Sequence, residues 1–198
     1  TGANRGIGLA LAKQFTDAGY TVIGSARRPD AAAELKATGA TVVALDVSDP
    51  ASVSAFAEAL ADQPIDILVN NAGILRREAP EFVDVDIEKM LLEHQVNALG
   101  PLRVTQALLA NLGDGERKVV ANISSMMGSM EMNTFGCCMG YRASKAALNS
   151  FTRTLAVDMK DQGMSFVVIH PGYVKTDMND GEGNITAEQS AAGLFRVI

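Results

Sequence analysis

The stretch TGANRGIG, residues 1–8, decides how the rest of the chain is interpreted. Its three glycines, at the spacing G-x-x-x-G-x-G, run directly into a segment in which Ile7, Leu11 and Phe15 recur at helical spacing. Glycines at such a turn let backbone N–H groups approach a pyrophosphate, and the start of a helix adds a favourable partial positive charge. A tight turn without a ligand is a simpler explanation of such glycines. The loop therefore indicates a dinucleotide site only if other segments agree with it.

Beyond this loop, short β-branched runs alternate with longer amphipathic stretches. The predicted strands are Thr21–Ser25, Thr41–Asp46, Asp66–Asn70, Lys118–Ser124 and Ser165–Ile169. A first helix is predicted from the glycine loop to the stop at Gly19. The further predicted helices are Pro29–Ala37, one from the Ser48-Asp49-Pro50 cap to Ala61, Asp86–Leu112 with a bend at Pro101, Tyr141–Met159, and one starting near Thr186.

The alternation of strands and helices predicts the fold class. Strands separated by helices of this length form right-handed crossovers, which give a parallel sheet with helices on both faces. The runs VVALD (42–46), DILVN (66–70) and FVVIH (166–170) are apolar and non-alternating apart from their polar ends, as strands of a doubly covered sheet are. We predict an α/β fold with a doubly wound parallel sheet (Rossmann), in a single domain over residues 1–198.

Composition excludes several classes of partner. A net charge of −6 and a pI of 4.9 argue against binding to the nucleic-acid backbone. No apolar run approaches the roughly 18 residues that would span a membrane. The only cysteines, Cys137 and Cys138, are neighbours that rarely bridge each other, which favours a reducing compartment, most simply the cytoplasm. No metal-ligand spacing is present, so we expect no metal site. The partner that we expect is a small molecule.

The residues that follow the predicted strand Thr21–Ser25 indicate which dinucleotide is bound. The residue that contacts the adenosine ribose is expected about 20 positions beyond the glycine loop. Ala26, Arg27 and Arg28 lie there, and the next acid along the chain is Asp30. An acid would bind a free 2′-hydroxyl, whereas an arginine matches a 2′-phosphate. Arg5, in the glycine loop, supplies a second cation on the same side. Solvated surface arginines are the alternative, but the pattern favours NADP over NAD.

Tyr141 and Lys145 are four residues apart in a predicted helix and so share one face. A tyrosine with a pKa of about 10 is a poor acid or base at neutral pH. A lysine ammonium and a positive nicotinamide ring beside it would favour the phenolate, and a shift of about 2–3 units would suit proton exchange with an alcohol. Alone, this spacing is more often a pair on a helix surface.

Other polar residues follow the strands at the edge of the sheet where ligands of α/β proteins bind. Ser124-Ser125 ends one strand, Asn70-Asn71-Ala72-Gly73 ends the preceding one, and His170-Pro171-Gly172 ends the last. Asn97 lies in the long helix just before Gly100-Pro101, where a bend could free a carbonyl for water. With these residues expected at the same edge, the Tyr141–Lys145 pair becomes part of a candidate site.

Together these segments resemble the short-chain dehydrogenase/reductase family. The matching segments fall in order along the whole chain and are TGANRGIG (1–8), Asp46-Val47, NNAG (70–73), Asn97, the serine strand, YRASK (141–145) and PGYVKT (171–176). The spacing between Ser125 and Tyr141 is longer than is common in the family. The extended loop Met126–Gly140 resembles the branch that contains sniffer-type carbonyl reductases and C-factor-like proteins.

The resemblance implies a role for each catalytic candidate. It implies Tyr141 as general acid/base, and Lys145 as the residue that binds the nicotinamide ribose and lowers the tyrosine pKa. Ser125, chosen over Ser124 because the family uses the second serine, would orient the carbonyl, and Asn97 would hold a water in a proton relay. The cofactor contacts that it implies are Gly2, Asn4, Arg5, Gly6, Ile7, Gly8, Arg27, Asp46, Val47, Asn71, Ala72, Gly73, Tyr141, Lys145, Pro171, Gly172, Val174 and Thr176.

The activity implied by the resemblance is that of an NADP-dependent oxidoreductase that reduces an aldehyde or ketone. A C-factor-like signalling or cofactor-sensing protein that keeps the fold is the alternative. Family habit further implies a homodimer or homotetramer. The family usually has a strand immediately before Thr1 and another beyond Ile198, so we expect a sheet without its first and last strands. The methionines of the Met126–Gly140 loop either line a permissive pocket or fill the core or a subunit contact.

Overall fold

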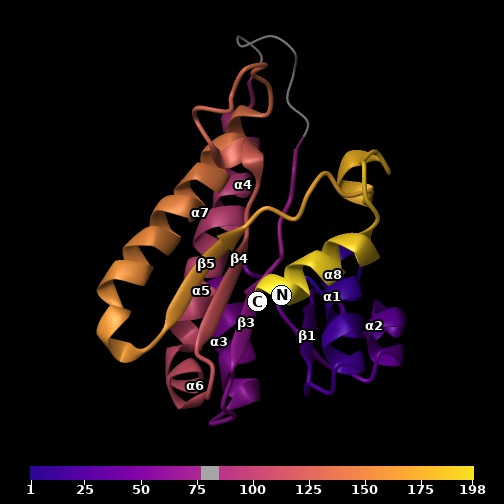
Figure 1. Cartoon of the computed structure of the whole chain (residues 1–198), viewed down its shortest axis with the longest axis vertical. Coiled ribbons are helices and arrows are strands. Elements are labelled where there is room, and N and C mark those ends of the chain that lie inside the picture. Colours follow the sequence, from indigo (N-terminus) through magenta and orange to yellow (C-terminus); the bar gives the residue numbers. More distant parts are fainter. Residues whose placement is uncertain (77–84) are drawn as a thin grey trace.

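Five short strands form two parallel sheets in the computed structural model, which describes residues 1–76 and 85–198 (Figure 1). One sheet pairs two strands and the other pairs three, in the order β1-β2 and β3-β4-β5, and every pairing is parallel. The fold class predicted from the alternating pattern is therefore confirmed. The strands are β1 (Ile23–Ala26), β2 (Thr41–Ala44), β3 (Ile67–Asn70), β4 (Val119–Ile123) and β5 (Ser165–Ile169).

Some of the helices begin at a residue whose side chain caps them. Asp49 accepts a hydrogen bond from the Ala51 amide, 3.0 Å away, at the start of α3, and Thr186 forms a capping box with Gln189 at the start of α8. The α-helices are α1 (Gly6–Asp17), α2 (Ala33–Ala37), α3 (Pro50–Leu60), α4 (Ile87–His94), α5 (Gly100–Ala107), α6 (Leu109–Asp114), α7 (Met139–Asp158) and α8 (Ala187–Val197). Short 3-10 turns are η1 (Pro29–Ala31), η4 (Met126–Gly128), η5 (Lys160–Gln162) and η6 (Asp177–Asn179).

The prediction of one bent helix over Asp86–Leu112 is confirmed in part: the region is helical, but it is divided. This region comprises α4, a π-helical turn η3 (Gln95–Leu99), α5 and α6. Pro101 lies in the first turn of α5, where its missing N–H costs no hydrogen bond, and the wider π turn absorbs the break just before it. The Pro29–Ala37 helix is likewise divided, into η1 and α2.

Both faces of the three-stranded sheet are covered. In β4, Ala121 and Ile123 face the side on which α1 and α8 pack, whereas Val120 faces the core shared with α3 and α5. Figure 1 shows α7, the long orange helix, running beside this sheet. The period of two along each strand places apolar residues on both faces, as the continuously apolar runs predict. No helix in the described ranges is long and apolar enough to cross a membrane.

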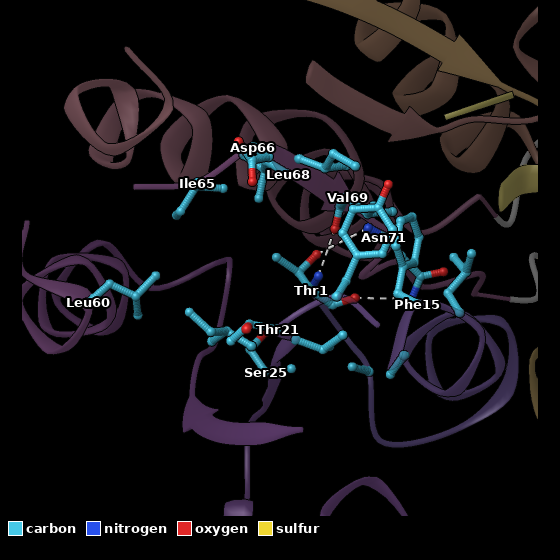
Figure 2. Close-up of a pocket in the computed structure, with 18 of the residues that line it drawn as sticks. Thr1, Phe15, Thr21, Ser25, Leu60, Ile65, Asp66, Leu68, Val69 and Asn71 are labelled. Carbon is cyan, nitrogen blue, oxygen red and sulfur yellow. Dashed lines mark hydrogen bonds between the residues drawn. The ribbon is translucent and has the colours of Figure 1, made fainter. Parts of the chain in front are cut away.

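A cavity of about 560 Å³ separates the two sheets (Figure 2). Its walls include β1 on one side and β3 on the other. Residues Thr1 to Ala3 join the two strands at their carboxyl ends: the Ala3 amide donates to the Ser25 carbonyl over 2.9 Å, and the Thr1 amino group donates to the Val69 carbonyl over 2.7 Å. The division lies where the family resemblance places a strand before Thr1. The glycine loop is therefore hydrogen-bonded to a strand of each sheet.

Candidate active site

The glycine loop is tied to the end of β3. The side-chain amide of Asn71 donates to the carbonyls of Thr1 and Gly2 over 3.0 and 3.1 Å. Gly2 and Gly6 have φ angles of +62° and +54°, which favour glycine. No side chain caps the start of α1, so its first N–H groups are open to an anion. The loop therefore has the geometry that its sequence predicts for a phosphate cradle.

Replacing Gly8 by alanine is expected to destabilise the protein by about 1–3 kcal/mol, because the new methyl group has no room. A Cβ on Gly8 would overlap the Gly2 carbonyl oxygen and lie 2.5 Å from the Asn71 side-chain nitrogen. Gly193→Ala is the matched control in α8, because no atom lies within 4 Å of its Cβ position. That variant should be neutral or gain up to about 1 kcal/mol of helix propensity. Urea unfolding measures both, and equal free-energy changes would contradict the close packing of the loop.

Arg27 and Asp46 follow the two strands of the smaller sheet. Both lie just past the paired residues Ala26 and Ala44. The Ser48 hydroxyl, which donates to Asp46 Oδ1 over 2.6 Å, holds the pKa of Asp46 below its usual range, and the charge of Arg27 acts in the same direction. Arg27 itself is exposed. The structure thus brings these two expected adenosine contacts to the same edge.

Arg5 does not stand alone at the glycine loop. Its guanidinium forms an ion pair with Asp177 in η6, with 2.9 Å between Nη1 and Oδ2. Both side chains are mostly exposed, so the pair is worth about 0–1 kcal/mol and opens readily. Close by, a Cβ on Gly6 would lie 3.5 Å from Thr176 Cγ2. The segment after β5 therefore passes close to the glycine loop.

The four catalytic candidates come from different elements. Tyr141 and Lys145 lie on α7, Ser125 follows β4, and Asn97 lies in the π turn η3. Lys145 Nζ is 5.7 Å from the centre of the Tyr141 ring. A Cβ on Gly73, after β3, would lie 3.3 Å from Asn97 Oδ1 and 3.8 Å from Lys145 Nζ. These residues meet at the carboxyl edge of the three-stranded sheet, where the sequence places them.

In the protein alone the pKa of Tyr141 lies above its usual value; the lowering expected from Lys145 also involves the bound nicotinamide ring. Burial raises the pKa of Tyr141 to about 12, against a smaller lowering from its hydrogen bond with Ser125, and the charge of Glu93 raises it further. Burial also lowers the pKa of Lys145 to about 8. The Lys145 ammonium donates to the Ile123 carbonyl, 2.8 Å away. It is therefore held by the backbone beside the phenol rather than by the phenol.

The two serines after β4 differ in direction. Ser124 is buried, and its hydroxyl donates to Asn149 Oδ1 on α7 over 2.6 Å. Ser125 is half-buried, and its hydroxyl is hydrogen-bonded to Tyr141. The first serine therefore fixes α7 against the sheet, and the second lies beside the candidate acid. This arrangement supports the choice of Ser125.

Asn97 is fully buried, and its side chain is completely engaged. Its amide oxygen accepts from the Ile74 amide over 2.8 Å, and its amide nitrogen donates to the Ile74 carbonyl over 2.8 Å and to the Ser144 hydroxyl over 3.0 Å. The bend that was predicted at this position is the π turn. Asn97 therefore holds the wall of the site through its side chain.

The loop after Ser125 exposes its apolar side chains. Met130 is 88% exposed and Phe135 70% exposed, so these residues do not fill the core. His94 packs edge-on against Phe151 with ring centres 6.5 Å apart, in agreement with a structural histidine. Within residues 1–76 and 85–198, no group of His, Cys, Asp and Glu side chains could hold a metal ion.

Sequence reasoning missed three residues of the site. Asp177 is 172 positions from its partner Arg5, and Ser144 was not connected with Asn97. Glu93 is fully buried on α4, and its carboxylate accepts from the Arg76 amide over 2.7 Å. The only local signal for Glu93 is its position four residues before Asn97 on one helix face.

The chain is similar to known proteins over most of its length. A sequence profile described as short chain dehydrogenase matches residues 1–185. The protein named C-signal, from Myxococcus xanthus, is 42% identical over 144 residues, which cover 73% of this chain and 86% of C-signal.

Solved structures are similar over almost the whole chain. An NADPH-bound carbonyl reductase from chicken fatty liver has a TM-score of 0.90 and 32% identity, with 99% of this chain and 88% of the reductase covered. The carbonyl reductase Sniffer of D. melanogaster has a TM-score of 0.92 and 28% identity, with 100% and 88% covered. This chain is therefore similar to both reductases in sequence and in fold.

Proposed function

The chain belongs to the short-chain dehydrogenase family, and from this premise we propose that it is an NADP-dependent carbonyl reductase. Its substrate would be an aldehyde or a ketone. One observation carries the proposal: Tyr141, Ser125 and Lys145 meet at the sheet edge, on the same side as the open start of α1. The carbonyl reductases of similar fold support this choice of reaction.

The residues present fit a dinucleotide. The uncapped start of α1 and the Gly2–Gly6 turn would receive the pyrophosphate. Arg27 is exposed and carries a cation where a 2′-phosphate would lie, and Asp46 stands beside it. The wall beside the nicotinamide would comprise Asn71, Ala72, Gly73, Pro171, Gly172, Val174 and Thr176.

The chemistry divides between the cofactor and the chain. When bound, NADPH supplies the hydride to the carbonyl carbon. The Tyr141 hydroxyl donates its proton to the carbonyl oxygen, and the Ser125 hydroxyl donates a hydrogen bond to the same oxygen. Lys145 holds its ammonium beside the ring and stabilises the phenolate that remains. Asn97 fixes the wall at Ile74.

The pKa values of the pair set their protonation states before the cofactor binds. With a pKa of about 12, the Tyr141 phenol keeps its proton at neutral pH and can donate it. With a pKa of about 8, the Lys145 ammonium is mostly protonated at the same pH. Proton donation is then downhill once negative charge develops on the substrate oxygen.

A substrate panel tests the proposed activity. Aldehydes and ketones of increasing size are offered with NADPH or NADH, and cofactor oxidation is followed together with alcohol formation. We expect NADPH-dependent reduction of at least one carbonyl class. Binding of NADPH without reduction of any member would contradict the proposal.

The Arg27→Asp variant is expected to weaken NADPH binding about ten- to a hundredfold, because charge-assisted bonds are lost and a repulsive charge is gained. NADH binding should change much less, and added salt should reduce the wild-type preference. Arg153→Asp, at an exposed position on α7, makes the same change of charge as a control. Titration calorimetry measures the affinities of the three proteins for NADPH and NADH. The wild type should prefer NADPH by at least about tenfold, and equal affinities at low salt would overturn the NADP assignment.

Similarity to C-signal favours a second candidate, a signalling protein that binds the cofactor as a sensor. A sensor needs cofactor binding but no proton donor. The presence of Tyr141, Ser125 and Lys145 in one cluster supports the enzyme instead. The substrate panel separates the two functions, because a sensor would bind NADPH and reduce nothing.

A further inference from the structure

Three segments meet beside Tyr141 in a regular pattern. On the long helical region, Glu93 and Asn97 are four residues apart; on α7, Gly140 and Ser144 are four residues apart. Residues with this spacing share a helix face. The third segment follows β3 and contributes the alternate residues 74 and 76. The two helix faces and the segment are joined at two levels. Each level contains one residue from each helix and one from the segment.

The first level is built around Asn97. Its side chain bonds both the amide and the carbonyl of Ile74, and it donates to the Ser144 hydroxyl. Ser144 in turn donates to the Tyr141 carbonyl over 2.7 Å. Lys145 follows Ser144 directly. This level therefore positions Lys145 against the wall of the site.

The second level is built around Glu93. One carboxylate oxygen accepts from the Arg76 amide over 2.7 Å. The other lies against the backbone of Gly140, where a Cβ would overlap it and would also lie 2.8 Å from Met90. Gly140 is the second residue of α7, so the carboxylate stands at the positive end of a 20-residue helix. Tyr141 follows Gly140 directly.

We propose that Glu93 is a positioning residue for Tyr141, which fixes the first turn of α7 to the wall at residues 74–76. This inference rests on the proposed reductase function. Asn97 and Glu93 then act in the same way. Asn97 ties the wall to Ser144, which precedes Lys145, and Glu93 ties it to Gly140, which precedes Tyr141. A carboxylate suits the second level because it can accept from the wall and still face the helix start.

The charge of Glu93 gives this role a measurable consequence. Lys145 on the same helix, Cys138 at the helix start and Glu93 on α4 are the ionisable groups around the phenol in the described residues. Arg142 is turned away, and its Nε donates to the carbonyls of Gly136 and Cys137. Among these groups, Glu93 raises the pKa of Tyr141, and Cys138 raises it less. Removing that charge should therefore lower the pKa.

The Glu93→Gln variant tests the inference, because glutamine keeps the size and the acceptor but not the charge. Alcohol oxidation with NADP⁺ rises with pH as Tyr141 loses its proton. In the variant this rise should move to lower pH by about half a unit or more, with the KM for NADP⁺ unchanged. Glu93→Ala, which also loses the tie to Arg76, should reduce kcat about tenfold or more. Glu88→Gln, exposed on the same helix, should change neither.

An unshifted pH profile in a folded Glu93→Gln protein would overturn the inference, even if Glu93→Ala loses activity or fails to fold. Carbon-13 NMR titration of the tyrosine rings gives the same comparison without turnover, with Tyr20→Phe and Tyr173→Phe for assignment. A wild type that reduces no carbonyl would defeat the proposed function. The NMR titration would then still decide whether Glu93 acts on Tyr141.

Discussion

Tyr141→Phe is expected to lower carbonyl turnover about a hundred- to ten-thousandfold, the usual contribution of a positioned general acid. Phenylalanine keeps the ring and loses only the hydroxyl, which is hydrogen-bonded to Ser125. The affinity for NADPH should stay within about twofold, because the proton donor adds little to ground-state binding. Steady-state kinetics and calorimetric titration of NADPH measure the two quantities separately.

Tyr20→Phe is the control for the loss of a phenol elsewhere. The Tyr20 hydroxyl accepts from Arg117 over 2.9 Å, and its ring packs on Phe15, outside the candidate site. That variant should retain full turnover. If Tyr141→Phe kept more than about a tenth of the rate, a cost of only about 1.4 kcal/mol, Tyr141 would not be the acid.

Lys145→Met is expected to reduce turnover about a hundredfold or more, because the phenolate would lose its neighbouring cation. Methionine has similar length and no charge, so the same variant also changes stability in a defined way. Burial lowers the pKa of Lys145 from 10.5 to about 8 in the folded protein. The ammonium is thus a cost to the fold while it is protonated.

The sign of the pH dependence follows from that lowered pKa. Between about pH 8 and 10.5 the unfolded chain binds more protons at this residue than the folded chain, so stability rises with pH. The rise amounts to about 3 kcal/mol over the window and should be absent in Lys145→Met. Lys160→Met, at an exposed position, should keep it. Urea unfolding across this range decides, and identical slopes in all three proteins would show that Lys145 is not desolvated.

Most of the fold could be predicted because the apolar strands encode it locally. The strand Ser165–Ile169 was predicted with its correct bounds, and the other strands within two residues at each end. The break at η3 could not be predicted, because a proline near position 101 fits a kinked helix and an interrupted one equally well. In the structure the π turn packs against α7.

The candidate site was predictable where it depends on the ends of strands. Parallel strands bring their carboxyl ends to one edge, so Ser125 and Gly73 were placed near each other from the sequence. Contacts between distant segments were not predictable. Three of these contacts depend on how α7 packs against its neighbours. They are the hydrogen bond from Ser124 to Asn149, the hydrogen bond from Lys145 to the Ile123 carbonyl, and the burial of Glu93.

Transfer of deuterium from C4-deuterated NADPH to a carbonyl substrate tests the central claim most directly. The reduced substrate is analysed by mass spectrometry, with each of the two C4 positions labelled in turn. We predict that one labelled cofactor gives an alcohol with one deuterium on the former carbonyl carbon, and that Tyr141→Phe forms almost none of it. Label in neither alcohol, or reduction that proceeds equally without NADPH, would contradict the assignment of this chain as a carbonyl reductase.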